Sequence, residues 1–348
     1  MEISIAITTC NRATSLARTL EALAAQDFPP GDFEVIVADN GSTDDTRDVC
    51  GAYGKKIDNF TYIYDNRPGQ LVGWHRSLNI MQGEVACFID DDVRPAITWL
   101  SSLKEVYDNE SVGLATGPIR LNYEVNPPDW IAHLTLGEPG ALTLPAFGLL
   151  DCGEEICEIP GNFVWGTNFT VRKKLVHAAG GFHPCAMPGR LLHFHGDGEI
   201  HVGRWVDNAG HRVIYHPGAS VDHDIPRTRL SLKSLKSKFV TNGFTRSFQT
   251  IREMGSTYDP PDEREIRVMA LRYFRDPELA PVKILSLIEE GIREGLATHI
   301  HHFQNDPAFK EWVLRDNYLD LDACYVHPDL TPVDEKDNAV KDWREGEE

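Results

Sequence analysis

Three consecutive carboxylates, Asp90, Asp91 and Asp92, end an apolar stretch that begins at Val85. The stretch is short, follows Gly83 and is rich in residues typical of a buried strand. Adjacent unpaired carboxylates inside a core would carry a large desolvation cost, so we expect them at the end of the strand, where open α/β sheets bind ligands. Hard oxygen ligands gathered at one point suit Mg²⁺ or Mn²⁺. A divalent cation at such a place is typical of proteins that bind phosphate-bearing substrates.

These carboxylates must be held at one edge of a sheet. The first third of the chain has an alternating α/β pattern that can form such a sheet. Apolar runs of strand length alternate with stretches that carry apolar residues at helical spacing. We expect strands over 3–8, 33–38, 60–64 and 85–90, and helices over 14–25, 43–53 and 71–81. Strands in this rhythm pair in parallel through right-handed crossovers. The loops at Thr9, Asp39, Asn66 and Asp90 should therefore share one edge of the sheet.

The rest of the chain has a different pattern. Residues 99–224 are less regular and predict a mixed sheet with long functional loops. Beyond them, the spacing predicts helices over 230–248, 266–274, 282–299 and 307–314. Lys233, Lys236 and Lys238 in the first of these helices favour a solvated helix face over docking on a membrane surface. The acidic residues 334–348 are expected to be disordered.

Composition argues against several classes of function. Lys and Arg number 34 and Asp and Glu 53, and the net charge of −19 argues against nucleic acid or an anionic membrane as the main partner. Seven cysteines without a CxxC pair argue against a zinc module and a disulfide framework. Reduced thiols, no signal-like segment and no apolar run of membrane-spanning length together predict a cytoplasmic protein without a transmembrane segment.

Short motifs over residues 3–224 resemble, in order and spacing, those of the inverting glycosyltransferases of family 2, which have the GT-A fold. They lie at 8–12, 39–46, 66–69, 90–92, 164–168, 180–182, 196–199 and 215–223. Each string alone is weakly specific, whereas their order and spacing together are quite specific. Residues 225–348 lie outside the resemblance.

The resemblance implies roles for residues at the sheet edge. A nucleotide-diphosphate sugar would be bound by Thr8, Thr9, Arg12, Asp39, Asn66, Asp90 and Asp91. Asp39 would accept a hydrogen bond from uracil N3–H, although it could instead cap the following helix, as Ser42 or Asp44 could. Asp92 and His223 would hold Mn²⁺ or Mg²⁺, which would bridge the diphosphate. The alternative is a simple acidic turn, and the buried strand before the carboxylates favours the metal site.

The resemblance also implies that Asp197 is the catalytic base. Transfer with inversion needs a carboxylate that removes a proton from the acceptor on the face opposite the leaving nucleotide. The usual family string has Glu followed by Asp, whereas this chain has Gly196 before Asp197. Glu199 and His195 are competing bases, and a solvated acidic loop is the alternative without catalysis. The glycines on both sides of Asp197 favour close approach of a ligand.

The acceptor is expected to contact a turn and one nearby carboxylate: Gly166, Thr167, Asn168 and Glu199. The turn would present backbone N–H groups and an amide to sugar hydroxyls, and an ordinary turn is the alternative. Arg227 and Arg229 lie in a predicted loop that could close on the diphosphate or remain solvated. Cys10 and Trp74 depart from the family, because many relatives have a base-stacking aromatic residue at the first position and Arg at the second.

We therefore expect an α/β protein with a GT-A type, Rossmann-like, mixed but mainly parallel sheet flanked by helices and followed by a helical C-terminal extension. Residues 1–98 would form the nucleotide-sugar-binding half and 99–225 the acceptor-binding and catalytic half of one domain. Residues 226–333 would form the extension and 334–348 the tail. The expected activity is metal-dependent, inverting transfer of a sugar from a nucleotide-diphosphate sugar, UDP-linked, to an unidentified acceptor by single displacement.

Other partners and functions remain open at this point. The acceptor could be a saccharide, a natural product, a peptide or a lipid-linked group, and the chain could form a homo-oligomer. A metal-dependent nucleotidyltransferase also uses carboxylates and Mg²⁺, but it normally has a Gly-rich basic loop, whereas residues 8–12 contain one Arg and no Gly. A non-catalytic nucleotide-sugar-binding protein would have no need of Asp197.

Overall fold

The first third of the chain folds in the predicted α/β alternation. The computed structural model describes residues 1–138, 140–331 and 340–341. It begins with β1 (Ile3–Thr9), α1 (Ala13–Ala24), β2 (Phe33–Asp39), α2 (Thr46–Tyr53), β3 (Phe60–Tyr64), α3 (Gln70–Ile80) and β4 (Val85–Asp90). Apart from residues 340–341, the predicted acidic tail 334–348 lies outside the described residues.

The parallel strands of this part bring the predicted polar residues to one edge. β1 pairs in parallel with β2 on one side and with β4 on the other. In this register Thr9 lies opposite Asp39, and Thr8 lies opposite Asp90. Because parallel strands end at the same edge, the loops after β1, β2 and β4 are neighbours, as the sequence predicts.

The large sheet continues beyond β4 with strands of both directions. Its order is β11-β13-β6-β12-β4-β1-β2-β3-β15. The added strands are β6 (Val112–Thr116), β11 (Cys157–Glu158), β12 (Phe169–Arg172), β13 (Arg212–Tyr215) and β15 (Val340–Lys341). β12 runs antiparallel to both β4 and β6, whereas the longest ladders are parallel. The predicted mixed sheet is thereby confirmed.

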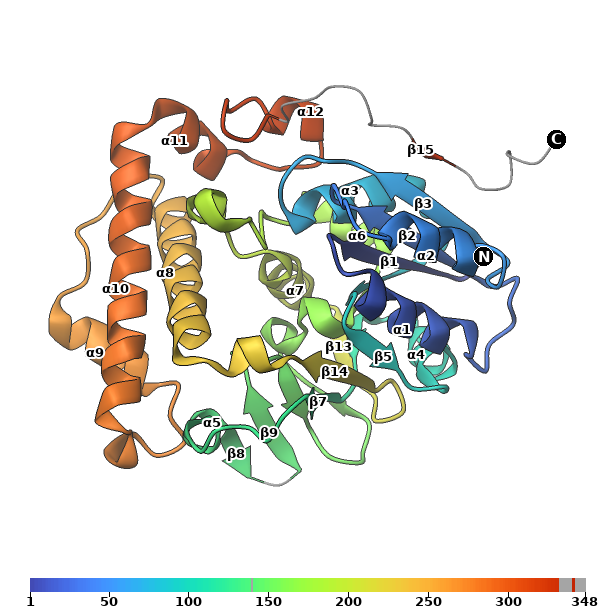
Figure 1. The fold of residues 1–348 in the computed structure, drawn as a ribbon, viewed down its shortest axis with the longest axis horizontal. Coiled ribbons are helices and arrows are strands. Elements are labelled where there is room, and N and C mark those ends of the chain that lie inside the picture. The colour runs from blue at the N-terminus through green and yellow to red at the C-terminus, as the bar shows by residue number, and fades with distance from the viewer. Residues whose placement is uncertain (139, 332–339, 342–348) are drawn as a thin grey trace.

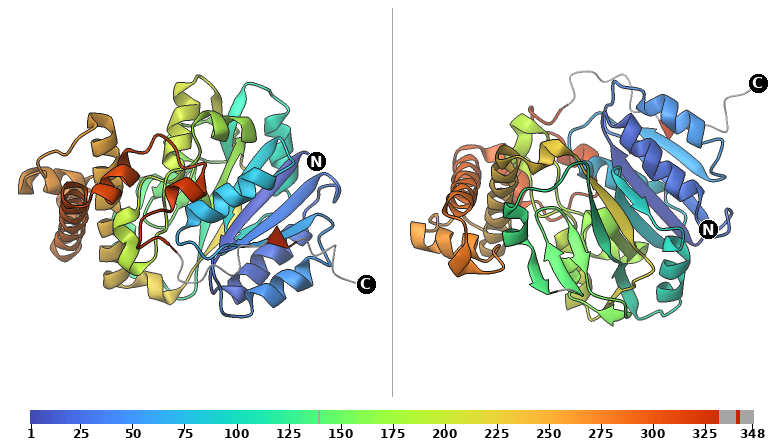
Figure 2. Two further views of the ribbon diagram at one scale, coloured as in Figure 1. Left: turned by 90° about the horizontal axis from the view of Figure 1, so that it is seen from above. Right: turned by 60° about the horizontal axis from the view of Figure 1, so that its bottom comes forward.

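Helices cover both faces of the large sheet (Figure 2). The buried residues of α1, α2 and α4 (Trp99–Tyr107) pack with one set of strand side chains. Those of α3, α6 (Lys173–Ala178) and α7 (Glu199–Asn208) pack with the set on the opposite face. Since successive strand residues point to opposite faces, this burial explains why the strands are apolar along their whole length.

A second, smaller sheet carries the end of the predicted motif region. Its order is β5-β14-β7-β10-β9-β8. The strands are β5 (Val93–Pro95), β7 (Ile119–Tyr123), β8 (Leu136–Glu138), β9 (Ala141–Leu144), β10 (Leu149–Asp151) and β14 (Val221–Ile225), with α5 (Trp130–Leu134) beside them. β14 runs antiparallel to β5 with His223 opposite Val93. This register places His223 next to the residue that precedes Val93, which is Asp92.

Short 3₁₀ turns connect these elements and the C-terminal helices. They are η1 (Gly161–Phe163), η2 (Gly166–Asn168), η3 (Gly189–Phe194), η4 (Arg227–Leu230) and η5 (Pro277–Leu279). Four of them, η1 to η4, lie in the segments that the sequence predicted to contain functional loops. The predicted irregular middle of the chain is therefore largely turns and short strands.

The C-terminal extension is helical, as predicted. It contains α8 (Leu232–Met254), α9 (Glu263–Leu271), α10 (Val282–Asn305), α11 (Pro307–Leu314) and α12 (Leu321–Cys324). The long helices α8 and α10 lie side by side in Figures 1 and 2. α8 runs six residues beyond its predicted end and stops before Gly255, whose φ of 66° suits glycine at a helix C-terminus. Among the described residues, no helix has the length and apolar character needed to cross a membrane.

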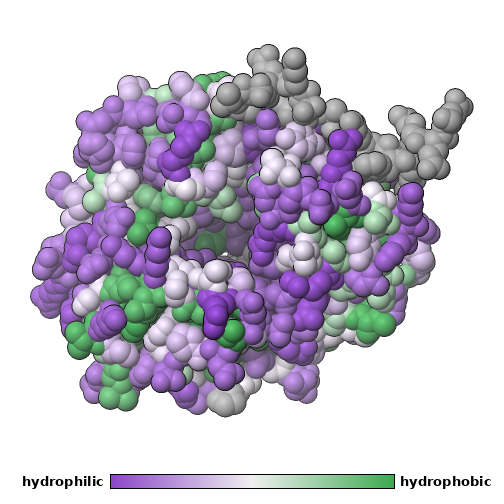
Figure 3. Space-filling model, viewed as in Figure 1, coloured by the Kyte–Doolittle hydropathy of each residue, from purple (hydrophilic) through white to green (hydrophobic). Residues whose placement is uncertain are grey.

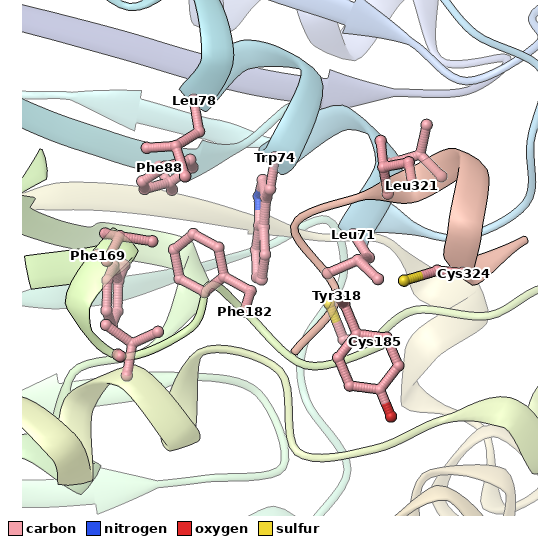
Figure 4. Close-up of a cluster of buried hydrophobic side chains, with 14 of the residues drawn as sticks. Leu71, Trp74, Leu78, Phe88, Phe169, Phe182, Cys185, Tyr318, Leu321 and Cys324 are labelled. Atoms are coloured by element: carbon pink, nitrogen blue, oxygen red, sulfur yellow. The ribbon is translucent and has the colours of Figure 1, made fainter. Parts of the chain in front are cut away.

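An aromatic cluster brings side chains of α3 and β4 together with those of β12 and of the segment after α6 (Figure 4). The ring of Phe182 lies 4.6 Å from Trp74 of α3 and 4.8 Å from Phe88 of β4, measured between centroids. Phe169 of β12 completes the group at 5.6 Å from Phe182. Trp74, which departs from the family pattern, is therefore a core residue whose indole is 1% exposed.

The imidazole of His75 is locked beside this cluster in its neutral form. Its Nδ1 lies 2.8 Å from the Tyr318 carbonyl oxygen, and its Nε2 accepts the backbone N–H of Phe182 at 2.9 Å. Because Nε2 must keep its lone pair for the second bond, the ring cannot take up a proton without losing it. Burial lowers the pKa of His75 to about 4.

We expect acid to destabilise the protein through His75. In the unfolded chain its pKa returns to about 6.5, so the unfolded state binds more protons than the folded state between pH 6.5 and pH 4. The free energy of unfolding should therefore fall as the pH drops through this window, by on the order of 2–3 kcal/mol from His75 alone. Urea denaturation of wild type and His75→Gln measures the effect, and the variant should lose less stability on acidification. An equal pH dependence in both proteins would contradict it.

Candidate active site

Asp90 ends β4 with its carboxylate held from two sides. Gln70 Nε2 at the start of α3 donates to one oxygen at 3.0 Å. Thr167 Oγ1 in η2 donates to the other at 3.2 Å. Asp90 therefore connects the predicted nucleotide edge with the predicted acceptor segment.

Asp91 is the most deeply held of the three carboxylates. It accepts hydrogen bonds from Thr9 Oγ1 at 2.6 Å and pairs with Arg12 at 2.9 Å. Burial raises the pKa of Asp91 to about 7, while the charge of Arg12 and the Thr9 hydrogen bond oppose that rise. Thr9, Arg12 and Asp91 thus form one connected group at the end of β1 and β4.

Asp92 faces His223 across the junction of the two sheets. His223 Nε2 lies 3.5 Å from Asp92 Oδ1, and that oxygen has no hydrogen-bond partner among the described residues. The other imidazole nitrogen, Nδ1, lies 2.9 Å from the Phe147 carbonyl oxygen. A carbonyl can only accept, so Nδ1 carries the proton and Nε2 presents a lone pair toward Asp92. A lone pair and a carboxylate oxygen that face each other are a suitable pair of ligands for a cation.

Two arginines supply positive charge at the same place. Arg12 donates to Asp92 Oδ2 at 2.7 Å. Arg229 Nη1 donates to His223 Nε2 at 3.0 Å and lies 3.6 Å from Asp92 Oδ2. Burial opposes ionisation of Asp92, but the charge of Arg12 and its hydrogen bond lower the pKa of this carboxyl. Arg227, the other predicted arginine of this loop, is exposed and does not line the cavity described below.

Asp92 and His223 are suitable ligands for Mn²⁺ or Mg²⁺ if a substrate supplies further ligands. The described part of the chain has no group of three or more His, Cys, Asp or Glu side chains that could hold a metal ion. Asp92 and His223 would therefore supply two ligands, and diphosphate oxygens and water would complete the shell, as is usual for cations bound with nucleotides. Arg229 would have to release His223 Nε2 for such binding.

A cavity of about 420 Å³ opens beside this pair. It corresponds to the hollow near the centre of Figure 3, between the α/β part and the helical extension. Its lining includes His223 and Asp90 together with the candidate bases Asp197, Glu199 and His195. Asp92 borders a neighbouring hollow of about 570 Å³ together with Arg12 and Asp44. The structure thus brings the predicted metal ligands and all candidate bases to one region.

Asp197 is oriented by two side chains behind it. The Nδ1–H of His183 donates to Oδ1 at 2.5 Å, and Gln249 Nε2 donates to Oδ2 at 3.0 Å. Burial disfavours the carboxylate, but these hydrogen bonds and the nearby imidazoles lower the pKa of Asp197 to about 2. His183 itself is buried, with its pKa lowered to about 4 by desolvation, and it does not line the cavity. Asp197 is therefore the member of this pair that meets the cavity.

The other two candidate bases have different surroundings. Glu199 begins α7 and accepts the backbone N–H of Gly166 at 2.8 Å, while burial raises its pKa. His195 has its pKa lowered to about 4 by burial, and its Nδ1 has no hydrogen-bond partner in the described part of the chain. Glu199 thus fixes the backbone of the segment that carries Thr167.

Asn168 does not present its amide to the cavity. Its side chain is fully buried, Oδ1 accepts from Trp99 Nε1 at 3.0 Å, and Nδ2 donates to the Ala219 carbonyl at 2.9 Å. The amide therefore bonds within the protein. Gly166 and Thr167 of the same turn do line the cavity.

The remaining residues predicted to bind the nucleotide are Asp39, Thr8 and Asn66. Asp39 is 1% exposed. Its Oδ1 accepts a hydrogen bond from the backbone N–H of Ser42, and its Oδ2 accepts one from the Tyr62 hydroxyl at 2.7 Å. Thr8 packs against α3, where a side chain larger than that of Gly73 would collide with it. Asn66 lies at a third hollow on the C-terminal side. The structure thus groups Thr9, Arg12 and the three carboxylates, while Thr8, Asp39 and Asn66 line neither of the two larger hollows.

Helix α8 contributes residues that the motifs did not identify. Gln249 holds Asp197, Thr245 Oγ1 donates to the Gly196 carbonyl at 2.9 Å, and Lys238 lines the cavity. These positions are separated by seven and four residues, so they lie along one face of the helix. The sequence contains this spacing, but no local sequence pattern indicates which face of α8 packs against the α/β part.

Comparison with known proteins identifies the family. Residues 4–177 match Glycosyl transferase family 2. Glycosyltransferase AglE of Haloferax volcanii is 24% identical over 214 residues, 61% of this chain and 64% of that protein. Glucosyl-dolichyl phosphate glucuronosyltransferase of the same organism is 23% identical over 261 residues, 71% of this chain and 76% of that protein. The mannosyltransferase PcManGT from Pyrobaculum calidifontis, solved with GDP-Man and Mn²⁺, has a TM-score of 0.52 at 18% identity and covers 91% of this chain and 84% of its own.

These matches agree with the architecture described above. The family match covers half of the chain, and the alignment with AglE spans slightly less than two thirds of that relative. The likeness to the mannosyltransferase extends over the mixed sheets and the C-terminal helices. The chain therefore belongs to glycosyl transferase family 2 and is a glycosyltransferase with the GT-A fold.

Proposed function

We propose that this enzyme transfers a sugar with inversion from a nucleotide-diphosphate sugar to an acceptor in a single, metal-dependent displacement. The observation that carries the proposal is the shared cavity, which both His223 and Asp197 line. In the proposed reaction the diphosphate leaves near His223, while the acceptor nucleophile, deprotonated by Asp197, attacks the opposite face of the anomeric carbon. Inversion by single displacement requires this arrangement.

Asp197 acts as the general base in this proposal. The hydrogen bonds from His183 and Gln249 orient its carboxylate toward the cavity and keep it ionised. Each of its oxygens keeps a second lone pair that can take a proton from the acceptor. Glu199 is better suited to shaping the site, since one of its oxygens already holds the Gly166 backbone. Orientation of a base within reach of the nucleophile is the first requirement for general base catalysis.

Asp92 and His223 hold the cation and Arg12 and Arg229 bind phosphate oxygens in this proposal. The divalent cation would neutralise diphosphate charge and thereby favour departure of the nucleotide. Arg229 contacts His223 through a single hydrogen bond and could turn from there to a phosphate, where a guanidinium binds two oxygens at once. The proposed donor is UDP-linked, because the resemblance to the family implies that Asp39 accepts a hydrogen bond from uracil N3–H.

The products of the reaction test the proposal. Purified enzyme with Mn²⁺ should hydrolyse or transfer sugar from UDP-glucose, UDP-N-acetylglucosamine or UDP-glucuronate and release UDP. GDP-mannose serves as the comparison, because the structural neighbour PcManGT was solved with it. Release of pyrophosphate instead of UDP would indicate nucleotidyl transfer and contradict the proposal. Binding of a nucleotide sugar without any turnover would support a non-catalytic binding protein.

A further inference from the structure

One wall of the cavity comes from the helical extension, outside the region that matches the family. Its residues lie on α8: Lys238, Thr241, Asn242 and Thr245. They are separated by three, one and three residues, so they form a single polar face of the helix. This face presents an ammonium, hydroxyls and an amide to whatever saccharide the cavity holds.

Close packing against α10 fixes the position of this wall. A Cβ added at Gly243 of α8 would lie 2.6 Å from the Ile292 carbonyl oxygen, and one at Gly295 of α10 would lie 2.1 Å from the Val240 carbonyl oxygen. The two helices therefore touch through their backbones at these glycines. Thr245 also donates to the Gly196 carbonyl, which ties the helix to the segment that carries Asp197. The polar face of α8 is thus a rigid part of the site.

The cavity carboxylates and the cavity ammonium differ in their partners. Asp90, Asp197 and Glu199 each accept hydrogen bonds from the protein. Lys238 has no hydrogen bond or ion pair among the described residues, although it lines the same cavity. Desolvation and the charge of Arg229 lower the pKa of Lys238, whereas Glu199 and Asp90 oppose that effect. The side chain of Lys238 is exposed and lines the cavity, and its ammonium has no partner in the described part of the chain.

The two other lysines near Lys238 on α8 do not line the cavity. Lys236 forms ion pairs with Glu294 at 3.2 Å and Glu290 at 3.6 Å on α10. Lys233 is exposed and does not line the cavity. The side-chain oxygen of Asn242, one turn after Lys238, accepts from Arg246 Nε at 2.9 Å, which leaves its NH₂ group as a donor. Lys238 and Asn242 thus offer a positive charge and a hydrogen-bond donor at adjacent turns.

We propose that Lys238 and Asn242 form a subsite for an anionic substituent, a carboxylate or a phosphate, on a saccharide bound in the cavity. The proposal rests on the proposed glycosyl transfer and specifies the substrate class for it. The ammonium would pair with the anion, and the Asn242 amide would donate to one of its oxygens. The anion can belong to the transferred sugar, as in a uronic acid, or to the acceptor.

Calorimetric titrations with matched neutral and anionic ligands test the subsite in the presence of Mn²⁺. The donor arm compares UDP-glucose with UDP-glucuronate. The acceptor arm compares methyl glucoside with methyl glucuronide and glucose 6-phosphate on enzyme saturated with UDP. In one arm the wild type should prefer an anionic ligand by about tenfold or more, the size expected for a charged hydrogen bond.

The variant Lys238→Gln should lose this preference while its affinity for the neutral partner stays within about twofold. Lys238→Arg keeps the positive charge and should retain most of the preference for the anionic ligand. Lys233→Gln removes the same charge from a position of the same helix that does not line the cavity, and this variant should behave as wild type. The ratio of anionic to neutral affinity is the informative number, because a general loss of structure would lower both.

Three results would overturn the proposal. They are equal affinity for neutral and anionic ligands in both arms, an unchanged preference in Lys238→Gln, and an equal loss of preference in Lys233→Gln. In each case binding of UDP itself remains as evidence for the proposed transferase. Failure of UDP and every UDP-sugar to bind would instead overturn the proposed function and the subsite together.

Discussion

Replacing Asp197 by asparagine should lower kcat for sugar transfer by about 10³-fold, within the range that general base catalysis contributes. The amide has nearly the same shape as the carboxylate but cannot accept a proton from the nucleophile. Binding of UDP with Mn²⁺ should stay within about twofold of wild type, because Asp197 bonds to His183 and Gln249 and not to the proposed cation ligands. Single-turnover transfer assays and calorimetry measure the two quantities.

Two further variants separate Asp197 from the competing bases. Glu199→Gln keeps an oxygen that can accept the Gly166 N–H, and it should retain substantially more activity than Asp197→Asn. His195→Asn should also retain activity, because His195 makes no contact with Asp197 or Glu199 in the hydrogen bonds of the described residues. Full activity in Asp197→Asn, or complete loss in Glu199→Gln alone, would show that the base has been assigned to the wrong carboxylate.

The second large effect is expected at the proposed metal ligands. Asp92→Ala should weaken Mn²⁺-dependent binding of UDP by about 100-fold or more, since changes in the outer shell of metal sites alone cost 10- to 100-fold. His223→Ala should act in the same direction, because its Nε2 lone pair faces the same carboxylate. Calorimetric titration with UDP at fixed Mn²⁺ gives both affinities.

A matched control for these variants lies in the same strand. Asp222 precedes His223 in β14, where successive side chains point to opposite faces, and it lines neither hollow. Asp222→Asn removes an equal charge and should leave UDP binding unchanged. If Asp222→Asn weakened binding as much as Asp92→Ala, general electrostatics and not metal coordination would explain the loss.

Much of the framework could be predicted because it depends on local patterns. The apolar runs before Thr9, Asp39 and Asp90 are buried strands that pair in parallel, so the order of elements alone brings their ends together. The helices of the extension were also predictable from their spacing. Their ends were less predictable: α8 continues through Gly243 to Met254 and ends before Gly255, which adopts the positive φ typical of a helix C-terminus.

The details of the site depend on long-range contacts that no local pattern encodes. His183 and Gln249 hold Asp197 from segments 14 and 52 residues away, and their identities alone give no indication of that role. Asn168 lies in a turn that a saccharide could contact, yet its amide bonds to Trp99 in the core. Lys238 is part of a predicted solvated helix face, and only the packing of α8 on the α/β part places it at the cavity.

The central claim is that a divalent cation held by Asp92 and His223 binds the diphosphate of the donor. Calorimetric titration of the wild-type enzyme with UDP, once with Mn²⁺ and once with EDTA, tests it most directly. We predict that Mn²⁺ raises the affinity for UDP by about tenfold or more, because each tenfold step corresponds to only about 1.4 kcal/mol of metal–diphosphate interaction. Equal affinity for UDP in Mn²⁺ and in EDTA would contradict the claim.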